Sequence, residues 1–293
     1  MGPRDSSNNY GVSTRKASSS SLGDDGGLQE DTMTILGFGS LLSEKSVRAC
    51  FAGVPFCCFV NAQPLSYFYP RMLYVQSRLT FPDLKNFRLG KVPNYRRVFG
   101  HPTGLFFRRG IANLETLEMS SLAVEPSSGH SLLVSVFEVS AKDMMEGGIP
   151  SQAFLEREEE FDIVEAPYIE LECDGVNVGA TDDSATKKGI ICTRSSDETY
   201  LEKWGNERFN DHFRKYGIET IWGWKEDSGL RPCAIYLRHC YLAAKSMGND
   251  CFESFLDETF LVDRKTTIRQ YLEKYPHILD LQPPPDLVSR YSG

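Results

Sequence analysis

The sequence predicts a mixed α/β fold, with strands in the middle of the chain and helices at its end. Short apolar segments of β-leaning composition recur between turns that contain Gly or Pro over residues 32–193. From Cys233 to Tyr275, apolar residues instead return every three or four positions, which is the period of amphipathic helices. The chain has no internal repeat, so we expect one α/β body rather than a repeat array.

Composition indicates a soluble globular protein and argues against several function classes. The 293 residues are 41% hydrophobic and 25% charged, and 32 basic against 40 acidic residues give a net charge of −8. This acidic balance argues against a nucleic-acid partner, and no apolar stretch approaches the ~20 residues of a membrane span. No signal-peptide pattern opens the sequence, so we expect a cytoplasmic protein.

Cysteine and histidine spacings indicate neither a disulfide framework nor a metal site. The eight cysteines include no C-x-x-C pair, and the five histidines form neither H-x-x-x-H nor H-E-x-x-H. We therefore expect reduced thiols in a reducing compartment and no bound metal.

The ends of the chain differ in composition from the part between them. Residues 1–31 are rich in Ser, Gly, Asn and Asp, which predicts a disordered tail, with organelle targeting as an alternative role. A single domain is expected over residues 32–280, with C-terminal helices at about residues 232–275. A proline run at residues 283–285 is expected to close the ordered part, which leaves residues 281–293 as a second tail.

The first elements of the domain are expected to be a strand, a helix and an aromatic β segment. Residues 32–36 are apolar and predict the strand, and residues 43–51 predict the helix, with Ser as its N-cap. Residues 55–69 are aromatic and favour β structure. Residues 70–113 contain several Pro and Gly, so we expect an irregular insertion over the surface, where binding loops are common.

The middle of the domain predicts a hairpin, two short helices and two further strands. The hairpin is expected from residues 122–124 and 131–139, with its turn at residues 126–129. The other elements are helices at residues 142–146 and 152–161, strands at residues 168–172 and 189–193, and a flexible loop over residues 174–185.

A glycine-rich segment, GFGSL at residues 37–41, follows the first strand and precedes the first predicted helix. Glycines there allow a sharp turn that brings backbone N–H groups close to a ligand, and the nearby helix start adds positive potential. Such a turn suits a carboxylate or a developing oxyanion. Leu42 stands where a dinucleotide fingerprint has its third Gly, and no Gly-Lys-Ser/Thr follows. A plain structural turn is the alternative interpretation.

Four glutamates lie close together in the helix predicted over residues 152–161. At about 100° per residue, Glu158 falls within the apolar face, between Phe154 and Phe161. The other acids fall at the edge of this face or on the solvent side: Glu156, Glu159 and Glu160. Burial on an apolar face raises the pKa of a carboxyl group, which suits a proton acceptor and donor at neutral pH. The alternative is a solvated charge run in which Glu158 pairs with a cation.

Tyr236 lies on the apolar stripe of the helix expected after Pro232 and could present its hydroxyl to a pocket. A tyrosine at such a position is more often a core residue whose hydroxyl is satisfied locally. His239 and Cys240 point about 100° apart on this helix, so they are not expected to form a nucleophile–base pair. The three tryptophans are expected to pack in the core.

Three segments, taken together and in order, resemble the γ-glutamylcyclotransferase-like family, which includes the AIG2-like proteins. That family opens with a strand and Tyr-Gly-Ser-(Asn/Leu)-Leu, and this chain has FGSLL at residues 38–42. The family's glutamate lies in a Leu-Asp-x-x-Glu or Arg-Glu pattern before an aromatic residue, and this chain has LERE at residues 155–158 and then Phe161. The family's closing helix carries Pro, Tyr, Ala-Lys and Gly, as do residues 232–248 here.

The resemblance implies a small mixed β-barrel with flanking helices and a helical C-terminal extension. It also implies an intramolecular aminolysis, in which the α-amino group of a γ-glutamyl substrate attacks its own γ-carbonyl and releases 5-oxoproline and an amine. Glu158 would carry the proton from the α-ammonium group to the leaving nitrogen. The implied substrate-binding residues are Leu36, Gly37, Phe38, Gly39, Ser40, Leu41 and Tyr236. The small γ-glutamyl molecule is the implied partner, and no metal or organic cofactor is implied.

Three departures from the family pattern leave alternatives open. Phe38 replaces the usual Tyr, which removes one hydroxyl, and the insertion at residues 70–113 has no counterpart in the small family members. The choice between Glu158 and Glu159 depends on register, and the apolar-face argument and the preceding Arg157 favour Glu158. The alternative function is a non-catalytic protein of the same fold that binds a small carboxylate or acts as a regulator.

Overall fold

The computed structural model describes residues 32–42, 84–171 and 186–291, all of which belong to the compact unit Asp31–Gly293. The predicted elements at residues 43–51 and 55–69, the loop at residues 174–185 and the tail at residues 1–31 lie outside the described residues. Four of the eight cysteines also lie outside them: Cys50, Cys57, Cys58 and Cys173.

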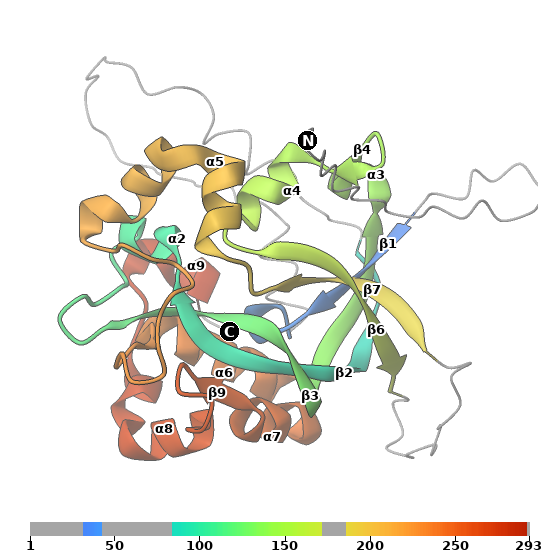
Figure 1. Cartoon of the computed structure of the whole chain (residues 1–293). Helices are drawn as coiled ribbons and strands as arrows, with labels where there is room; N and C mark the ends of the chain where they lie inside the picture. Colours follow the sequence, from blue (N-terminus) through green and yellow to red (C-terminus); the bar gives the residue numbers. More distant parts are fainter. Residues whose placement is uncertain (1–31, 43–83, 172–185, 292–293) are drawn as a thin grey trace, which may run out of the picture. The chain divides into compact units, whose positions relative to one another are not determined.

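Five strands close into a mixed β-barrel (Figure 1). They are β1 (Thr32–Gly37), β2 (Lys85–Pro102), β3 (Glu118–Ser140), β6 (Asp162–Glu170) and β7 (Lys187–Thr193). The hydrogen-bonded order is β3-β1-β7-β6-β2, and the pairing of β2 with β3 closes the ring. The β1–β7 pair is parallel, whereas the pairs β1–β3, β2–β3, β2–β6 and β6–β7 are antiparallel. This topology confirms the small mixed barrel that was expected.

The long ribbon of β2 and β3 corrects two predictions. The described part of the predicted insertion, from residue 84 onward, is not irregular, because β2 pairs with β3 from Lys85 to Pro102. The residues around 126–129 do not form a hairpin turn, because β3 continues past them along the same partner strand. Extra residues loop out there as a bulge, which Asn94 and Gly129 accommodate with φ values of +59° and +80°.

Neighbouring residues of β3 face opposite layers of the fold, because side chains alternate along a strand. Leu122 packs with Phe99 and with residues of the C-terminal helices, whereas Ala123 packs with Phe209 of helix α5 (Asp197–His212). Figure 1 accordingly shows α5 and the C-terminal helices on opposite sides of the β2–β3 ribbon. The barrel interior is lined by apolar side chains from all five strands, including Leu36, Val92, Val134, Ala166 and Ile191.

Short elements connect β3 to β6 and lie over one end of the barrel. In chain order these are α3 (Ala141–Met144), β4 (Met145–Glu146), β5 (Ile149–Pro150) and α4 (Gln152–Arg157). Ser151 caps α4, since its side chain accepts a hydrogen bond from Phe154 N. The predicted helix over residues 152–161 is therefore wrong beyond Arg157, where the chain leaves helical geometry.

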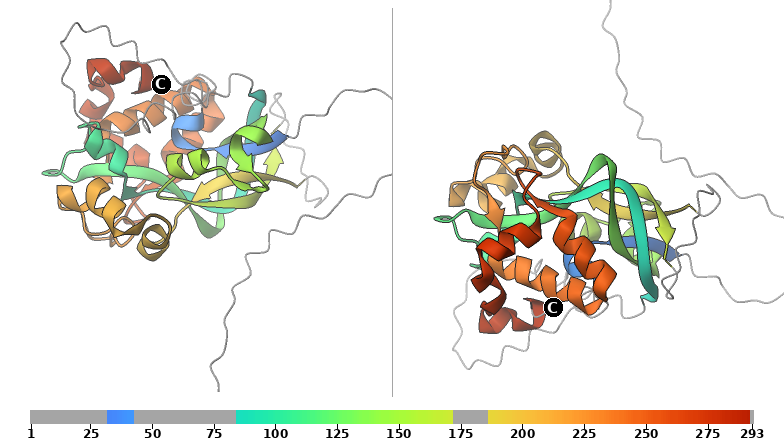
Figure 2. Two further views of the ribbon diagram at one scale, coloured as in Figure 1. Left: turned by 90° about the horizontal axis from the view of Figure 1, so that it is seen from above. Right: turned by 90° about the horizontal axis from the view of Figure 1, so that it is seen from below.

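The last third of the chain is helical, as predicted, and its helices lie together beside β2 and β3 (Figure 2). Its elements are η5 (Arg214–Tyr216), β8 (Arg231–Pro232), α6 (Ala234–Ser246), α7 (Asn249–Asp257), β9 (Thr259–Leu261), α8 (Ile268–Lys274), η6 (Pro276–Asp280), η7 (Pro285–Leu287) and α9 (Val288–Tyr291). The prolines at residues 283–285 do not close the ordered part, because Leu287 and Tyr291 are buried against Phe106 and Cys233. The predicted second tail is thus wrong for residues 285–291.

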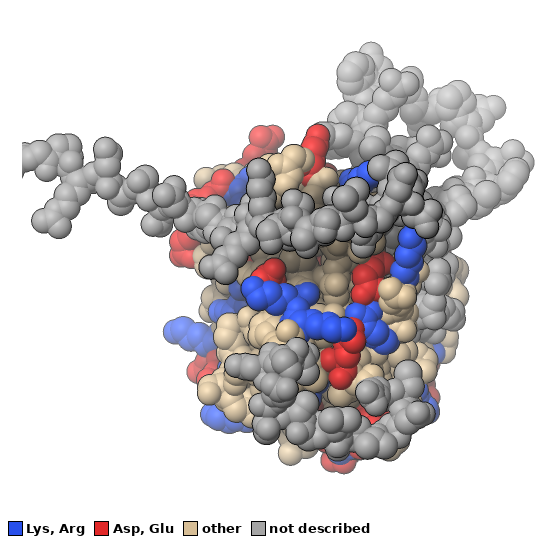
Figure 3. Space-filling view, turned by 90° about the vertical axis from the view of Figure 1, so that its right-hand side faces the viewer, with Lys and Arg blue, Asp and Glu red and all other residues tan. Residues whose placement is uncertain are grey.

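Cys192, Cys233, Cys240 and Cys251 are free thiols. No helix in the described ranges is long and apolar enough to cross a membrane. Within the same ranges, no group of three or more His, Cys, Asp or Glu side chains could hold a metal ion. Acidic and basic side chains intermingle on the face that Figure 3 shows. On the barrel strands, Arg88 forms ion pairs with both Glu138 and Glu170.

Candidate active site

The glycine turn is formed by η1 (Gly39–Leu42), directly after β1. Gly39 has a φ of +63°, a conformation that favours glycine, and a Cβ atom there would lie 2.8 Å from Leu122 Cδ2. Ser135 Oγ, on the neighbouring strand β3, donates a 2.6 Å hydrogen bond to Leu41 O. Leu41 N donates to Phe38 O at 3.3 Å. The turn is therefore held both by its own backbone and by a side chain of the barrel wall.

Tyr236 approaches this turn from α6. Its hydroxyl lies 3.4 Å from the position of a Cβ atom on Gly39, and its ring packs 5.0 Å from that of Phe106. Burial raises the pKa of the Tyr236 phenol well above its ordinary value, while hydrogen bonds with Ser40 and Ser121 act in the opposite direction. Three of the predicted site residues, Gly39, Ser40 and Tyr236, therefore meet in one place.

Glu158 caps the C-terminal end of α4, with its side chain 19% exposed. Its Oε1 accepts a 2.9 Å hydrogen bond from Arg157 Nε, so the cation pairing that the sequence left as an alternative is present. The carboxylate also interacts with the thiol of Cys192. Burial raises the pKa of that thiol well above its ordinary value, and the charge of Glu158 adds to the effect.

The register of the parallel pair β1–β7 relates Glu158 to the glycine turn. Ile35 pairs with Ile190, and two residues further on, the strands reach Gly37 and Cys192. The thiol that contacts Glu158 thus lies at the end of the barrel where η1 begins. Leu41 of the turn and Phe154 of α4 also pack into one apolar cluster.

The burial order of the glutamates differs from the helical-wheel expectation. Glu159 is 6% exposed and Glu160 is 5% exposed, although both were expected at the edge or on the solvent side. The reason is that α4 ends at Arg157, so the 100° spacing no longer applies to these residues. Glu159 and Glu160 point toward α5 and the start of α2 (Gly104–Arg108), as their hydrogen bonds to those elements indicate.

The remaining predicted residues take structural places around the turn. Leu36 is 2% exposed and faces the barrel interior. Phe38 packs between the barrel core and the cluster of the C-terminal helices. Gly37 is buried, and a Cβ atom there would collide with Ser135 Oγ. These residues support the turn by packing around it.

Sequence reasoning missed Ser121, Ser135 and Cys192. Ser121 and Ser135 reach the turn through the pairing of β3 with its neighbours, and Cys192 reaches Glu158 through β7. A lone serine or cysteine in a strand carries no local signal, so these contacts follow only from strand register.

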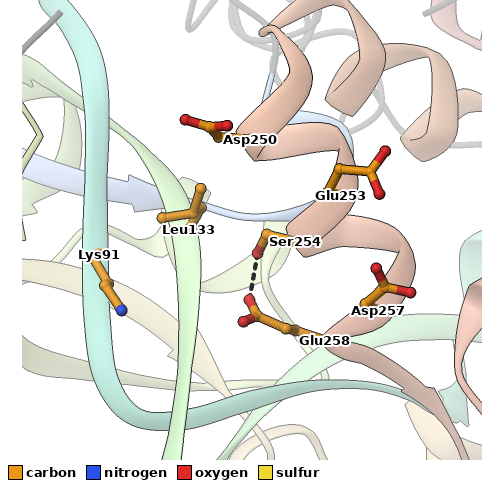
Figure 4. Close-up of a pocket in the computed structure, with 7 residues that line it drawn as sticks. All are labelled: Lys91, Leu133, Asp250, Glu253, Ser254, Asp257 and Glu258. Atoms are coloured by element: carbon orange, nitrogen blue, oxygen red, sulfur yellow. Dashed lines mark hydrogen bonds between the residues drawn. The ribbon is translucent and has the colours of Figure 1, made fainter. Parts of the chain in front are cut away.

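A hollow of about 370 Å³ lies elsewhere, between α7 and the β2–β3 ribbon (Figure 4). Figure 4 shows Glu253 and Asp257 turned away from Lys91, and Arg269 binds both of these carboxylates. The full lining is Lys91, Leu133, Asp250, Glu253, Ser254, Asp257 and Glu258. None of the predicted site residues lines this hollow, so it does not belong to the candidate active site.

No protein-family model matches the chain, and no curated protein matches its sequence. Its structure is similar to that of an uncharacterized protein from Homo sapiens (10% identity, TM-score 0.31, covering 65% of this chain and 89% of that one). It is also similar to that of a γ-glutamyl cyclotransferase (9% identity, TM-score 0.32, covering 64% of this chain and 89% of that one). A third similar structure is that of a protein of Arabidopsis thaliana solved in solution (10% identity, TM-score 0.27, covering 64% of this chain and 92% of that one).

Proposed function

We propose that this protein is a γ-glutamylcyclotransferase-type enzyme, which converts a γ-glutamyl compound into 5-oxoproline and a free amine. The observation that carries the proposal is the meeting of Gly39, Ser40 and the Tyr236 hydroxyl where β1 ends. A glycine turn with a phenol beside it offers hydrogen-bond donors to a carboxylate or to a developing oxyanion. Glu158 supplies the acid–base group at the same end of the barrel.

The reaction needs one group that accepts a proton and later returns it. The α-amino nitrogen attacks the γ-carbonyl carbon, so that the ring C–N bond forms, and the bond from this carbon to the leaving nitrogen then breaks. Glu158 takes the proton from the α-ammonium group before attack and delivers it to the leaving nitrogen. Because the nucleophile belongs to the substrate, the protein's main contribution is to hold the folded conformation over the turn.

The environment of the three consecutive acids supports Glu158 for this role over its neighbours. Both carboxylate oxygens of Glu159 are occupied, Oε2 by Arg208 and Oε1 by His212. Glu160 is bound to Thr103 and to the backbone of Gly104. Glu158 lies on the side of the chain turned toward β7, where it meets Cys192.

The test is 5-oxoproline release from a panel of γ-glutamyl amino acids, glutathione and γ-glutamyl amines. We expect the wild type to act on at least one class, and Glu158→Gln to lower kcat by about 100-fold or more. The matched control is Glu156→Gln, because Glu156 lies on the same helix and bonds Gln152 in an exposed position. Full activity of Glu158→Gln would refute the assignment.

A carboxylate-binding protein without catalysis is the alternative that the same experiment addresses. Calorimetric titration with 5-oxoproline and with a non-cleavable γ-glutamyl analogue would then show binding that Tyr236→Phe weakens. The wild type would release no 5-oxoproline from any compound in the panel.

A further inference from the structure

The turn at residues 158–161 is fixed to the rest of the protein by hydrogen bonds from several elements. Phe161 N donates to Glu158 O at 3.0 Å and closes the turn. Trp204 Nε1 donates to Glu159 O, and Trp222 Nε1 donates to Glu160 O, each at 3.0 Å. Two tryptophans from separate segments therefore hold two successive carbonyl groups of one turn.

The carboxylate of Glu159 adds a second attachment, to α5. Arg208 donates to its Oε2 from Nε at 2.8 Å and from Nη2 at 2.7 Å, and His212 Nδ1 lies 2.8 Å from its Oε1. The guanidinium of Arg208 also stacks over the Trp204 ring, 4.3 Å from its centroid. Gly205 has non-helical geometry and divides α5 between Trp204 and Arg208. Both parts of α5 therefore donate hydrogen bonds to Glu159.

The carboxylate of Glu160 provides the attachment to α2. Its Oε1 accepts hydrogen bonds from the hydroxyl of Thr103 at 2.6 Å and from Gly104 N at 3.1 Å. Thr103 is the N-cap of α2, so Glu160 is joined to the point where β2 passes into that helix.

The two buried carboxyl groups also differ in charge. Burial opposes ionisation of Glu159, but the hydrogen bond with His212 and the charge of Arg208 hold its pKa below the ordinary value. Burial and the neighbouring charge of Glu159 raise the pKa of Glu160 to about 8. Near neutral pH the pair carries one negative charge, which Arg208 balances.

We propose that Glu159 and Glu160 are positioning residues, which clamp the turn at residues 158–161 to α5 and α2 and thereby aim Glu158 at Cys192 and the glycine turn. The effect of this clamp on catalysis rests on the proposed function of Glu158. The attachment of the turn to α5 and α2 does not. The side chains of Glu159 and Glu160 bind α5 and the start of α2, whereas the side chain of Glu158 meets Cys192 of β7. Anchoring the first two residues therefore limits the directions that Glu158 can take. A displacement of about 1 Å in a reacting group can lower a rate about 100-fold.

The reactivity of Cys192 reports the orientation of the Glu158 side chain without any measurement of enzymatic activity. We would measure alkylation of Cys192 by iodoacetamide at pH 8 in the full chain, resolved by peptide mass spectrometry. In Glu159→Gln, the loosened turn should withdraw Glu158 and speed Cys192 alkylation by about tenfold. Cys233 is buried in a separate cluster and serves as the internal standard for general opening. The control variant is Glu165→Gln, because Glu165 lies on β6 and forms an exposed ion pair with Lys188.

Trp204→Phe is the second variant, in case Glu159→Gln opens the whole protein. It removes the bond to Glu159 O but keeps an aromatic ring under Arg208. The decisive quantity is the ratio of the Cys192 rate to the Cys233 rate. The clamp is supported if this ratio rises in either variant and stays constant in Glu165→Gln. An unchanged ratio in both variants overturns the proposal.

Kinetics separate failure of the clamp from failure of the proposed function. If Glu158→Gln is inactive, Glu159→Gln should lower kcat by about tenfold or more while KM changes by less than about twofold. That split distinguishes misalignment from lost substrate binding. If Glu158→Gln keeps full activity, the catalytic assignment fails, and the alkylation ratio still decides whether the clamp exists.

Discussion

The hydroxyl of Tyr236 lies 3.4 Å from the point that a Cβ atom on Gly39 would occupy, and Leu122 Cδ2 lies 2.8 Å from the same point. Residues from η1, β3 and α6 thus converge on a position where a hydrogen is the largest substituent that fits. This packing explains why glycine is required there, and it gives a test of the turn that does not depend on catalysis.

Gly39→Ala should lower the free energy of unfolding by about 1–3 kcal/mol more than Gly110→Ala does. The two glycines have nearly equal φ values, +63° and +65°, so the backbone strain of alanine is matched. A Cβ atom on Gly110 would meet nothing within 4 Å, which leaves the collision at Gly39 as the difference. Urea unfolding of the two variants measures it, and equal losses would contradict the packing described here.

Tyr236→Phe should lower kcat/KM for the active γ-glutamyl substrate by about tenfold and the free energy of unfolding by about 1 kcal/mol. The phenol hydroxyl interacts with Ser40 and Ser121, and phenylalanine keeps the ring contact with Phe106. Tyr241→Phe is the comparison, since Tyr241 lies on the same helix and its ring meets that of Phe252 edge to face. Steady-state assays and urea titrations would contradict the role of Tyr236 if both variants behaved alike.

Glu160→Gln should make the protein more stable than the wild type at pH 7 and above. The pKa of Glu160 is about 8 in the folded state, so between pH 5 and pH 8 the unfolded chain has lost a proton that the folded chain retains. Wild-type stability therefore falls as pH rises through this window, by about 2.5 kcal/mol between pH 5 and pH 7. Glutamine keeps an oxygen for Thr103 and Gly104 and does not titrate. Denaturant unfolding at several pH values tests this, and parallel pH curves for the two proteins would count against it.

His101→Phe should reduce the decrease in the free energy of unfolding that the wild type shows below pH 6.5. His101 is fully buried, stacks 4.1 Å from the Trp222 ring, and has no hydrogen-bond partner among the described residues for either ring nitrogen. Burial lowers the pKa of His101 to about 3, so below pH 6.5 the unfolded chain binds a proton that the folded chain does not. Wild-type stability should then fall as pH decreases, by about 2 kcal/mol at pH 5, relative to the variant. The same slope in both proteins would show that His101 does not titrate in this way.

Much of the fold could be predicted from local sequence, because strands and helices leave a periodic signal. Strands β1 and β7 and the C-terminal helices lie close to their expected positions, whereas β6 begins at Asp162, six residues before the strand expected over residues 168–172. The glycine turn and the helix that carries Tyr236 were also evident, since Gly-x-Gly after an apolar strand and a 3.6-residue period are local patterns.

The ribbon of β2 and β3 could not be predicted in this way. Its Gly, Pro and Asn residues, such as Pro93, Asn94 and Gly129, are typical of loops. Here they lie at bulges, where a long partner strand continues the pairing on both sides of each irregularity. The hydrogen bonds to that partner come from residues distant in sequence, so no local pattern predicts them.

The sequence by itself determined which chemical groups are available: a glycine turn, a phenol and a run of three acids. Tertiary structure alone decided which acid points where. Helix α4 stops at Arg157, and Trp204 and Trp222 capture the carbonyl groups of Glu159 and Glu160, so the direction of Glu158 depends on α5 and on the segment after η5. A side chain's direction after the last helical residue is set by whatever binds the released backbone, and here those binding groups lie more than 40 residues further along the chain.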